Sequence, residues 1–316
     1  MTKYLTELYY KMTTDLSSTP HTHYSKCLPV KVITLLRNNP FYSSLSENNS
    51  DIVLVRKNLS NLNPEQLNSF RNAMEKMMKI RDERGYNHIA GFHGAPDFYC
   101  WHHQRNRRTI KRARLFLPWH RAYLKWFEDH LRDHNAGVTQ CWWDWTAPLT
   151  RTGGIPKAYS EERIGNKRNP LYKFHIYVPR MNIPGMENIS IDRDTFRDIN
   201  WSIPLPTVDE IEKLYGIEDF GEFSDTLEDI HDNIHGWVGG TMSDILTAGF
   251  DPIFYTHHAN IDRIWWIWQL RHGNSTMPLE LLDVALPPFP YTVREVLNIY
   301  NLGYDYASLS SEIILR

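Results

Sequence analysis

The placement of histidines among apolar residues constrains this chain more than any other feature. His231 and His235 lie four residues apart in "LEDIHDNIHGWV", and His257 and His258 are adjacent in "DPIFYTHHANIDRIWWIW". Residues four apart on a helix project from the same face, so the first pair presents two rings side by side. Buried imidazoles need partners for their ring nitrogens, which either protein groups or a metal ion supply. The pattern predicts helices that face one another around a polar group.

Three of these histidines predict one metal site. His258 follows His235 within a second predicted helix, and Asp262 lies four residues further along the same helix face. Two imidazoles from one helix and one from the next give a three-nitrogen site. We expect Asp262 to act behind this site as a hydrogen-bond acceptor or ion-pair partner.

A second group of histidines occurs earlier, in "GFHGAPDFYCWHH" and "LFLPWHRAYLKWFE". His93, His120 and either His102 or His103 can supply three further imidazoles. Two sets of neutral nitrogens, without a carboxylate ligand or an HExxH motif, argue against a zinc hydrolase. Imidazole ligation suits copper, which binds such sites tightly. The sequence therefore favours a copper protein.

The apolar spacing and end signals predict a mainly helical protein. Asn63 can cap a helix whose first residue is Pro64, and its apolar residues recur at helical spacing. Between 151 and 205 the chain is rich in Gly, Pro, Asn and charge, which predicts long irregular loops with few short strands. Helices are expected over 63–83, 117–133, 218–238 and 252–272.

Composition excludes several classes of protein. The 316 residues carry a net charge of only −2, which gives no basic surface for nucleic acid or a membrane. The three cysteines, Cys27, Cys100 and Cys141, are too few and too scattered for a disulfide framework. The N-terminal stretch lacks the apolar segment of a signal peptide, and no apolar run is long enough to span a membrane. We therefore expect a cytoplasmic location.

Three motifs resemble the tyrosinase and polyphenol oxidase family of coupled binuclear copper proteins: "FLPWHRAYLKWFE", "HDNIHGWVGGTM" and "DPIFYTHHANIDRIWW". The resemblance implies a four-helix bundle around two copper ions, Cu A and Cu B, each held by three histidines. It assigns His93 and His120 to Cu A, and His231, His235 and His258 to Cu B. His257 would then brace the site by donating a hydrogen bond to a nearby group. Residues 51–272 would form the copper domain, with a 1–50 extension and a 273–316 tail packed on it.

The chain departs from the family at the middle ligand of Cu A. Many relatives have a histidine nine residues before the one in "WHR", where this chain has Lys111. Some relatives instead carry a Cys-x-His whose histidine is the ligand and whose cysteine is bonded to it as a thioether. We therefore assign His102, with His103 as the alternative, and interpret 104–114 as an insertion. Cys100 is either the thioether partner or a buried free thiol, and a damaged first site is the remaining possibility.

The resemblance also implies an activity, the oxidation of phenols, o-diphenols or o-aminophenols by dioxygen. Its candidate catalytic residues are Asp232, where relatives usually have Asn, and Glu222 as the water-holding glutamate, although Glu228 is nearer in sequence. The expected partners are dioxygen and a small phenolic or aminophenolic substrate. A hemocyanin-like oxygen binder without turnover is the alternative, and a zinc-loaded scaffold is a third. The arginine-rich insertion is expected to be a solvated loop, or else to attract anionic phenols.

Overall fold

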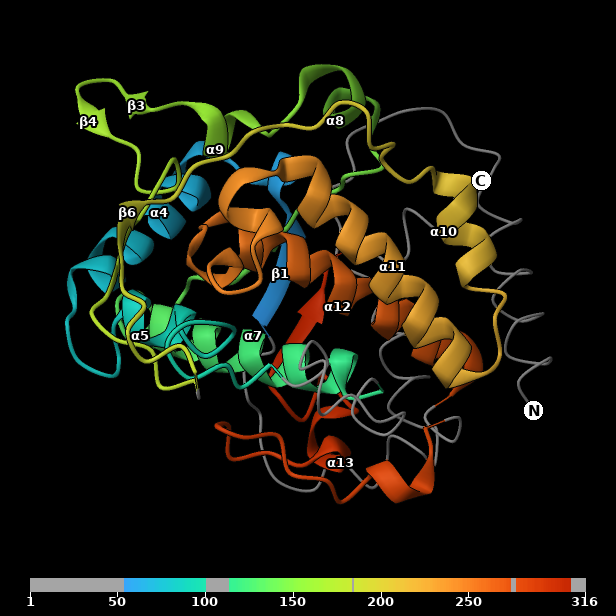
Figure 1. The fold of residues 1–316 in the computed structure, drawn as a ribbon. Coiled ribbons are helices and arrows are strands. Elements are labelled where there is room, and N and C mark those ends of the chain that lie inside the picture. Colours follow the sequence, from blue (N-terminus) through green and yellow to red (C-terminus); the bar gives the residue numbers. More distant parts are fainter. Residues whose placement is uncertain (1–53, 101–113, 184, 274–276, 308–316) are drawn as a thin grey trace, which may run out of the picture. The chain divides into compact units, whose positions relative to one another are not determined.

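The computed structural model describes residues 54–100, 114–183, 185–273 and 277–307. Four long helices form a bundle, and α7 packs against the other three (Figure 1). The predicted mainly helical class with few short strands is confirmed, and the described residues up to Tyr306 belong to one compact unit. The four helices are α4 (Pro64–Lys79), α7 (Phe116–Arg132), α11 (Phe220–Val238) and α12 (Ile253–His272).

The ends of these helices follow the sequence signals. The side chain of Asn63 accepts a hydrogen bond from the backbone N–H of Gln66, and the side chain of Gln66 accepts one from the backbone N–H of Asn63. Helix α12 begins directly after Pro252 and ends at Gly273, whose φ of 80° lies in the left-handed region that glycine tolerates. Nearly all of α12 is buried, so it forms the centre of the bundle.

Three short strands bring distant parts of the chain together. Strand β1 (Leu54–Asn58) lies between β2 (Cys141–Trp142) and β7 (Tyr304–Tyr306), and both pairings are parallel. Parallel neighbours need long connections, and here the helices supply them. The small sheet therefore joins the beginning, middle and end of the described chain.

The region predicted as loops contains more regular structure than expected. Two antiparallel hairpins form there, and the pairing of the second places His175 opposite Asp194. Each strand is so short that periodicity in the sequence could not reveal it. The elements in this region and at its two ends are α8 (Pro148–Gly153), α9 (Lys157–Ser160), β3 (Arg163–Ile164), β4 (Lys167–Arg168), β5 (His175–Val178), β6 (Ile191–Asp194) and α10 (Val208–Leu214).

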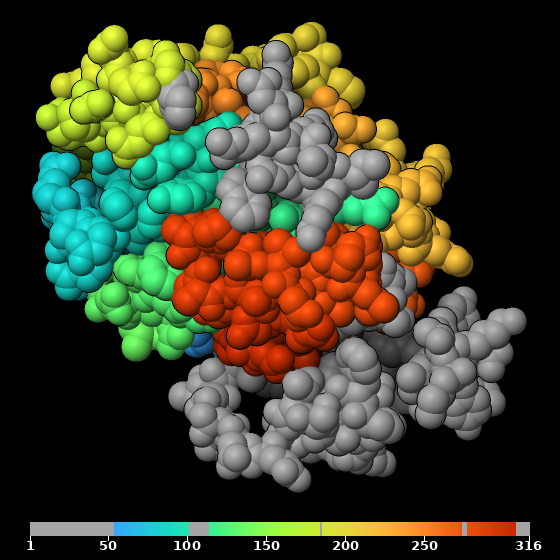
Figure 2. All heavy atoms as spheres, turned by 60° about the horizontal axis from the view of Figure 1, so that its bottom comes forward, coloured from blue at the N-terminus to red at the C-terminus, as the bar shows by residue number. Residues whose placement is uncertain are grey.

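The C-terminal segment 277–306 packs against α7. The ring of Phe289 contacts Trp119 and Tyr123, and the indole N–H of Trp119 donates to the carbonyl of Pro287 at 2.9 Å. Figure 2 shows this segment in red, beside the green part of the chain that includes α7. The remaining short elements are η1 (Leu59–Asn61), α5 (Tyr86–Ala90), η4 (Gly240–Ser243), η5 (Ala248–Phe250), η7 (Leu279–Leu281) and α13 (Val293–Val296).

A buried network of charges fastens α7 and α12 to the sheet. The Arg56 guanidinium of β1 pairs with Glu128 of α7 at 2.8 Å and with Asp262 of α12 at 3.2 Å. Asp262 also accepts from Arg121 of α7 and from the hydroxyls of two tyrosines in β7. Burial alone would raise the pKa of Asp262, but Arg121 and Arg56 outweigh it and hold that pKa below its usual value. Asp262 therefore pairs with two arginines rather than with a histidine.

Candidate metal centre

Three buried imidazoles converge between α11 and α12. The Nε2 atom of His258 lies 3.2 Å from Nε2 of His231 and 3.4 Å from Nε2 of His235. All three side chains are buried, and together with His257 they offer ligand atoms within 4.8 Å of one another. The structure thus brings the three predicted ligands of the second copper to one point.

The turn after α11 fixes the ring of His235. Gly239 ends the helix with a φ of 68°, and a Cβ there would lie 1.9 Å from the backbone oxygen of Asp198. Only glycine suits this position, and the chain then turns through η4. The turn brings the carbonyl of Met242 to the His235 ring, whose Nδ1–H donates to it at 2.7 Å.

The outer nitrogens of two other rings are also held. Nδ1–H of His120 donates to the carbonyl of Phe116 at 2.9 Å. Nδ1–H of His231 donates to the Asp232 carboxylate at 3.0 Å. A carbonyl can only accept, so the proton is on Nδ1 in His120 and His235, and their Nε2 atoms carry lone pairs. With the proton on Nδ1, Nε2 is the atom of each ring that can act as a metal ligand.

His257 differs from the expectation that it donates a hydrogen bond to a nearby group. Its ring is fully buried, and neither ring nitrogen has a hydrogen-bond partner in the part of the chain that the structure describes. The ring stacks on His231 with centroids 5.2 Å apart and lies edge-on to His235 at 5.0 Å. His257 therefore packs against the other rings and adds a nitrogen atom to the cluster, but it does not form the expected hydrogen bond with a described residue.

The first group is built from the turn after α5 and from α7. Ligand atoms of His93, Cys100 and His120 lie within 4.8 Å of one another, and all three residues are buried. The Cys100 sulfur is 3.9 Å from Nε2 of His120. His102, His103 and Lys111 lie outside the described residues. Two of the three predicted ligands of the first copper, His93 and His120, are therefore brought together here.

The two groups adjoin one another. The rings of His120 and His258 stack with centroids 4.2 Å apart and an angle of 12° between their planes. The ring of His93 lies 5.6 Å from that of His120 and 6.3 Å from that of His258. Helices α7 and α12 thus supply the contact through which the groups meet.

Burial favours the neutral form of His235 and His258. It lowers the pKa of His235 to about 4, an effect only partly offset by the hydrogen bond to Met242. Burial, followed by the neighbouring His120 and His231, lowers the pKa of His258 well below its usual value. Burial also raises the pKa of the Cys100 thiol, and nearby Glu228 and Asp232 raise it further. Neutral rings are the form that binds metal ions.

This set of donors suits a soft or borderline metal ion. Nε2 of His235 carries a lone pair and faces Nε2 of His258. Nε2 of His258 can carry at most one hydrogen, so it can donate to His231 or to His235 but not to both. The Nδ1 atom of His258 has no partner among the described residues. Buried nitrogens that face one another without enough hydrogens call for a cation, and an all-imidazole set fits copper.

The two predicted catalytic carboxylates have different positions. Asp232 follows His231 on α11, and its side chain is 56% exposed beside the cluster. Glu222 is exposed in the first turn of α11, nine residues before His231, and is not among the residues around the imidazoles. Glu228 lies one turn before His231 and is only 4% exposed. The structure therefore places Glu228, not Glu222, beside the metal centre.

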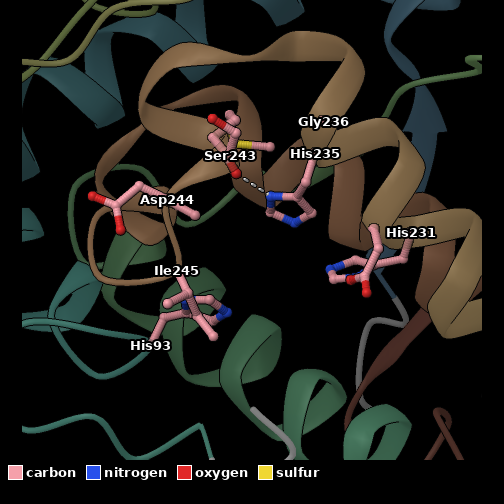
Figure 3. A pocket seen from close by; sticks show the side chains of 10 residues that line it. His93, His231, His235, Gly236, Ser243, Asp244 and Ile245 are labelled. Atoms are coloured by element: carbon pink, nitrogen blue, oxygen red, sulfur yellow. Dashed lines mark hydrogen bonds and ion pairs between the residues drawn. The ribbon is translucent and has the colours of Figure 1, made fainter. Parts of the chain in front are cut away.

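A cavity of about 590 Å³ opens beside the imidazoles. His93 borders it from one side, and His231 and His235 from another, as Figure 3 shows. The rest of its described lining consists of Asp232, Gly236, Met242, Ser243, Asp244, Ile245 and Ala248. The cavity thus reaches ligand candidates of both groups.

Sequence reasoning missed the role of the Met242 carbonyl. A backbone carbonyl carries no residue-type signal, although the glycine pair at 239–240 marks the turn that presents it.

Of the described helices, none is both long and apolar enough to cross a membrane.

Comparison with known proteins identifies the family. Residues 83–271 match the family model described as the common central domain of tyrosinase. The chain is 32% identical over 268 residues to hemocyanin G-type, units Oda to Odg, of Enteroctopus dofleini, which covers 77% of this chain and 9% of that protein. It is 29% identical over 268 residues to hemocyanin beta-C chain unit D of Helix pomatia, covering 79% of this chain and 62% of that protein. The chain thus spans less than two thirds of these relatives.

Solved structures show the same fold. A functional unit of octopus hemocyanin superposes with a TM-score of 0.65 at 28% identity, covering 81% of this chain and 68% of that one. Tyrosinase from Burkholderia thailandensis superposes with a TM-score of 0.65 at 22% identity, covering 82% and 74%. The chain therefore belongs to the tyrosinase family of type 3 copper proteins, whose members bind two copper ions and dioxygen.

Proposed function

We propose that this chain holds two copper ions in its histidine groups and oxidises phenolic compounds with dioxygen. His231, His235 and His258 would hold one ion. His93 and His120 would hold the other, together with His102, which lies outside the described residues. Bound copper supplies the one-electron redox chemistry through which dioxygen accepts electrons.

The observation that carries this proposal is the cavity beside the imidazoles. Its volume of about 590 Å³ lies within the usual range for small-molecule sites and is far larger than dioxygen requires. His93, His231 and His235 all border it, so an aromatic ring placed there would lie next to both groups. This position supports the oxidation of a substrate over oxygen binding alone.

Carboxylates near the cavity would accept the protons that the substrate releases. Conversion of an o-diphenol to an o-quinone releases two electrons and two protons, and a monophenol must lose its proton before it reacts. Asp232 lines the cavity and can accept a proton from a bound phenol. Glu228, buried one turn from His231, is the better candidate than Glu222 for holding a water molecule.

A second candidate function is reversible oxygen binding. It is favoured by the relatives, since hemocyanin units reach 32% identity over 268 residues of this chain. Such a role would use the same imidazoles but would need no room for a phenol.

Oxygen consumption by the copper-loaded full chain tests the proposal. We expect uptake and coloured product with catechol, o-aminophenol or a monophenol, and none for the zinc-loaded chain. An oxygen-dependent absorption that disappears on degassing, without product from any of these compounds, would instead establish the oxygen carrier. The Asp232→Asn variant tests the proton acceptor, because an unchanged ratio of monophenol to diphenol turnover would exclude that role.

A further inference from the structure

The outer nitrogens of the imidazoles do not all have the same kind of partner. His120 and His235 donate from Nδ1 to backbone carbonyls, which are neutral. His231 donates from Nδ1 to the Asp232 carboxylate, which is negatively charged. Of these three rings, His231 is the one whose Nδ1–H donates to a carboxylate. This asymmetry distinguishes one ligand of the second group.

We propose that Asp232 is a positioning residue that acts through His231 and makes the second site bind Cu(II) more tightly than Cu(I). This proposal rests on the copper site of the proposed function, but it does not require that phenols be turned over. Asp232 itself would not touch the metal ion. Its role would be to orient the His231 ring and to increase the electron donation of Nε2.

The physical basis is the charge of the hydrogen-bond partner. A carboxylate that accepts the Nδ1–H pulls that proton away from the ring, which gives the imidazole partial anionic character and makes Nε2 a stronger base. The 3.0 Å bond also fixes the ring with Nε2 towards His258, which lies 3.2 Å from it. A stronger, oriented donor favours the doubly charged ion over the singly charged one, because the electrostatic attraction is greater.

The geometry allows a clean substitution. Asp232 is 56% exposed on the surface of a helix, so Asp232→Asn should leave the fold intact. Asn keeps the acceptor oxygen and the size of the side chain, and removes only the charge. Asp229 offers a matched control, since it lies one turn earlier on α11, is exposed, and forms no hydrogen bond with an imidazole of the described residues.

Metal affinities measured by chelator competition test the proposal on the apoprotein. For Asp232→Asn we expect the Cu(II) affinity of one site to fall by about 10-fold, within the usual range for such partners, while the Cu(I) affinity changes little. A tenfold loss confined to Cu(II) raises the one-electron reduction potential of that site by about 59 mV. The other site and the Asp229→Asn control should stay as in the unaltered chain.

A second background assigns the affected site. In a His235→Leu chain the second group has lost a ligand, so the metal bound tightly there belongs to the first group. Adding Asp232→Asn to this background should leave that affinity unchanged. Circular dichroism and urea unfolding of each apoprotein verify the fold.

Several results would overturn the inference. The first is that Asp232→Asn has the same Cu(II) affinity and reduction potential as an unaltered chain that binds two ions. The second is that Asp229→Asn lowers the Cu(II) affinity as much as Asp232→Asn does. The third is that Asp232→Asn still lowers the Cu(II) affinity in the His235→Leu background. None of these depends on whether phenols are oxidised, so a failure of this inference is distinguishable from a failure of the proposed function.

Discussion

Helix α12 carries two buried polar groups of opposite design. Asp262 meets two arginines and two tyrosine hydroxyls, so its charge is fully compensated. One turn earlier, His257 and His258 retain ring nitrogens without partners among the described residues. The buried carboxylate of Asp262 has its full set of hydrogen bonds and contributes to stability. The buried rings of His257 and His258 keep nitrogen lone pairs that a metal ion can use. The two regions should therefore respond to substitution in opposite ways.

The largest expected effect is on the charge network. Asp262→Asn removes the carboxylate that pairs with the fully buried Arg121 and leaves the fully buried Arg56 with Glu128 as its carboxylate partner, so it should lower the free energy of unfolding by about 3–5 kcal/mol. Urea unfolding of the apoprotein measures this loss. The exposed pair Asp283 and Arg294 supplies the control, because Asp283→Asn should change stability little. Equal effects of the two substitutions would show that the network is not a stability element.

Asp305 tests whether every carboxylate near the sheet is compensated. Its partners are the backbone N–H of Tyr306 and the hydroxyl of Tyr300, and burial raises its pKa to about 6. A raised folded-state pKa contributes stability that is complete below about pH 4 and is lost as the pH rises through about 6. The shift corresponds to about 3 kcal/mol.

In Asp305→Asn this loss should be absent, so the stability of the variant relative to the unaltered chain should rise between pH 4 and pH 7. Urea titrations at several pH values measure the difference. A constant difference across this range would mean that Asp305 titrates normally.

The imidazole group should show the opposite response to the charge network. Replacing a buried polar group by an apolar one of similar size is often neutral, so His258→Leu should change apoprotein stability by only ~1 kcal/mol. A metal ion at 100 times its dissociation constant stabilises a folded protein by about 2.7 kcal/mol. His258→Leu should lose that gain at the second site. Thermal unfolding with and without Zn²⁺ measures both quantities, and a strongly destabilised apoprotein would contradict the comparison.

The last prediction concerns the turn that holds His235. In Gly239→Ala, alanine would have to adopt a φ of 68°, and its Cβ would clash with the backbone of Asp198. The substitution should lower the free energy of unfolding by about 1–3 kcal/mol. Gly165→Ala is the matched control, because Gly165 has a φ of 57° but open space around it. The clash should also displace Met242 and weaken metal binding, which the control should leave intact. Equal metal affinities in both variants would show that the turn does not position His235.

Much of this architecture follows from local sequence. The cap at Asn63 and the spacing of His231 and His235 depend on residues within one or two turns, and helix geometry then fixes what they do. Few short strands were predicted for this region, but the positions of the strands from β3 to β6 were not, because strands of two to four residues carry little periodic signal. Segments 1–53 and 101–113 lie outside the described residues, so the domain extension and the assignment of His102 stay predictions.

The sequence by itself determined that imidazoles would share helix faces, because the helical repeat alone decides which side chains point the same way. Only the tertiary structure decided that Glu228 rather than Glu222 lies beside them and that Asp262 pairs with Arg56. It also decided that neither ring nitrogen of His257 has a hydrogen-bond partner among the described residues. Arg56 and Asp262 are separated by 206 residues. Burial and partner identity depend on contacts between such distant segments, and no local pattern encodes them.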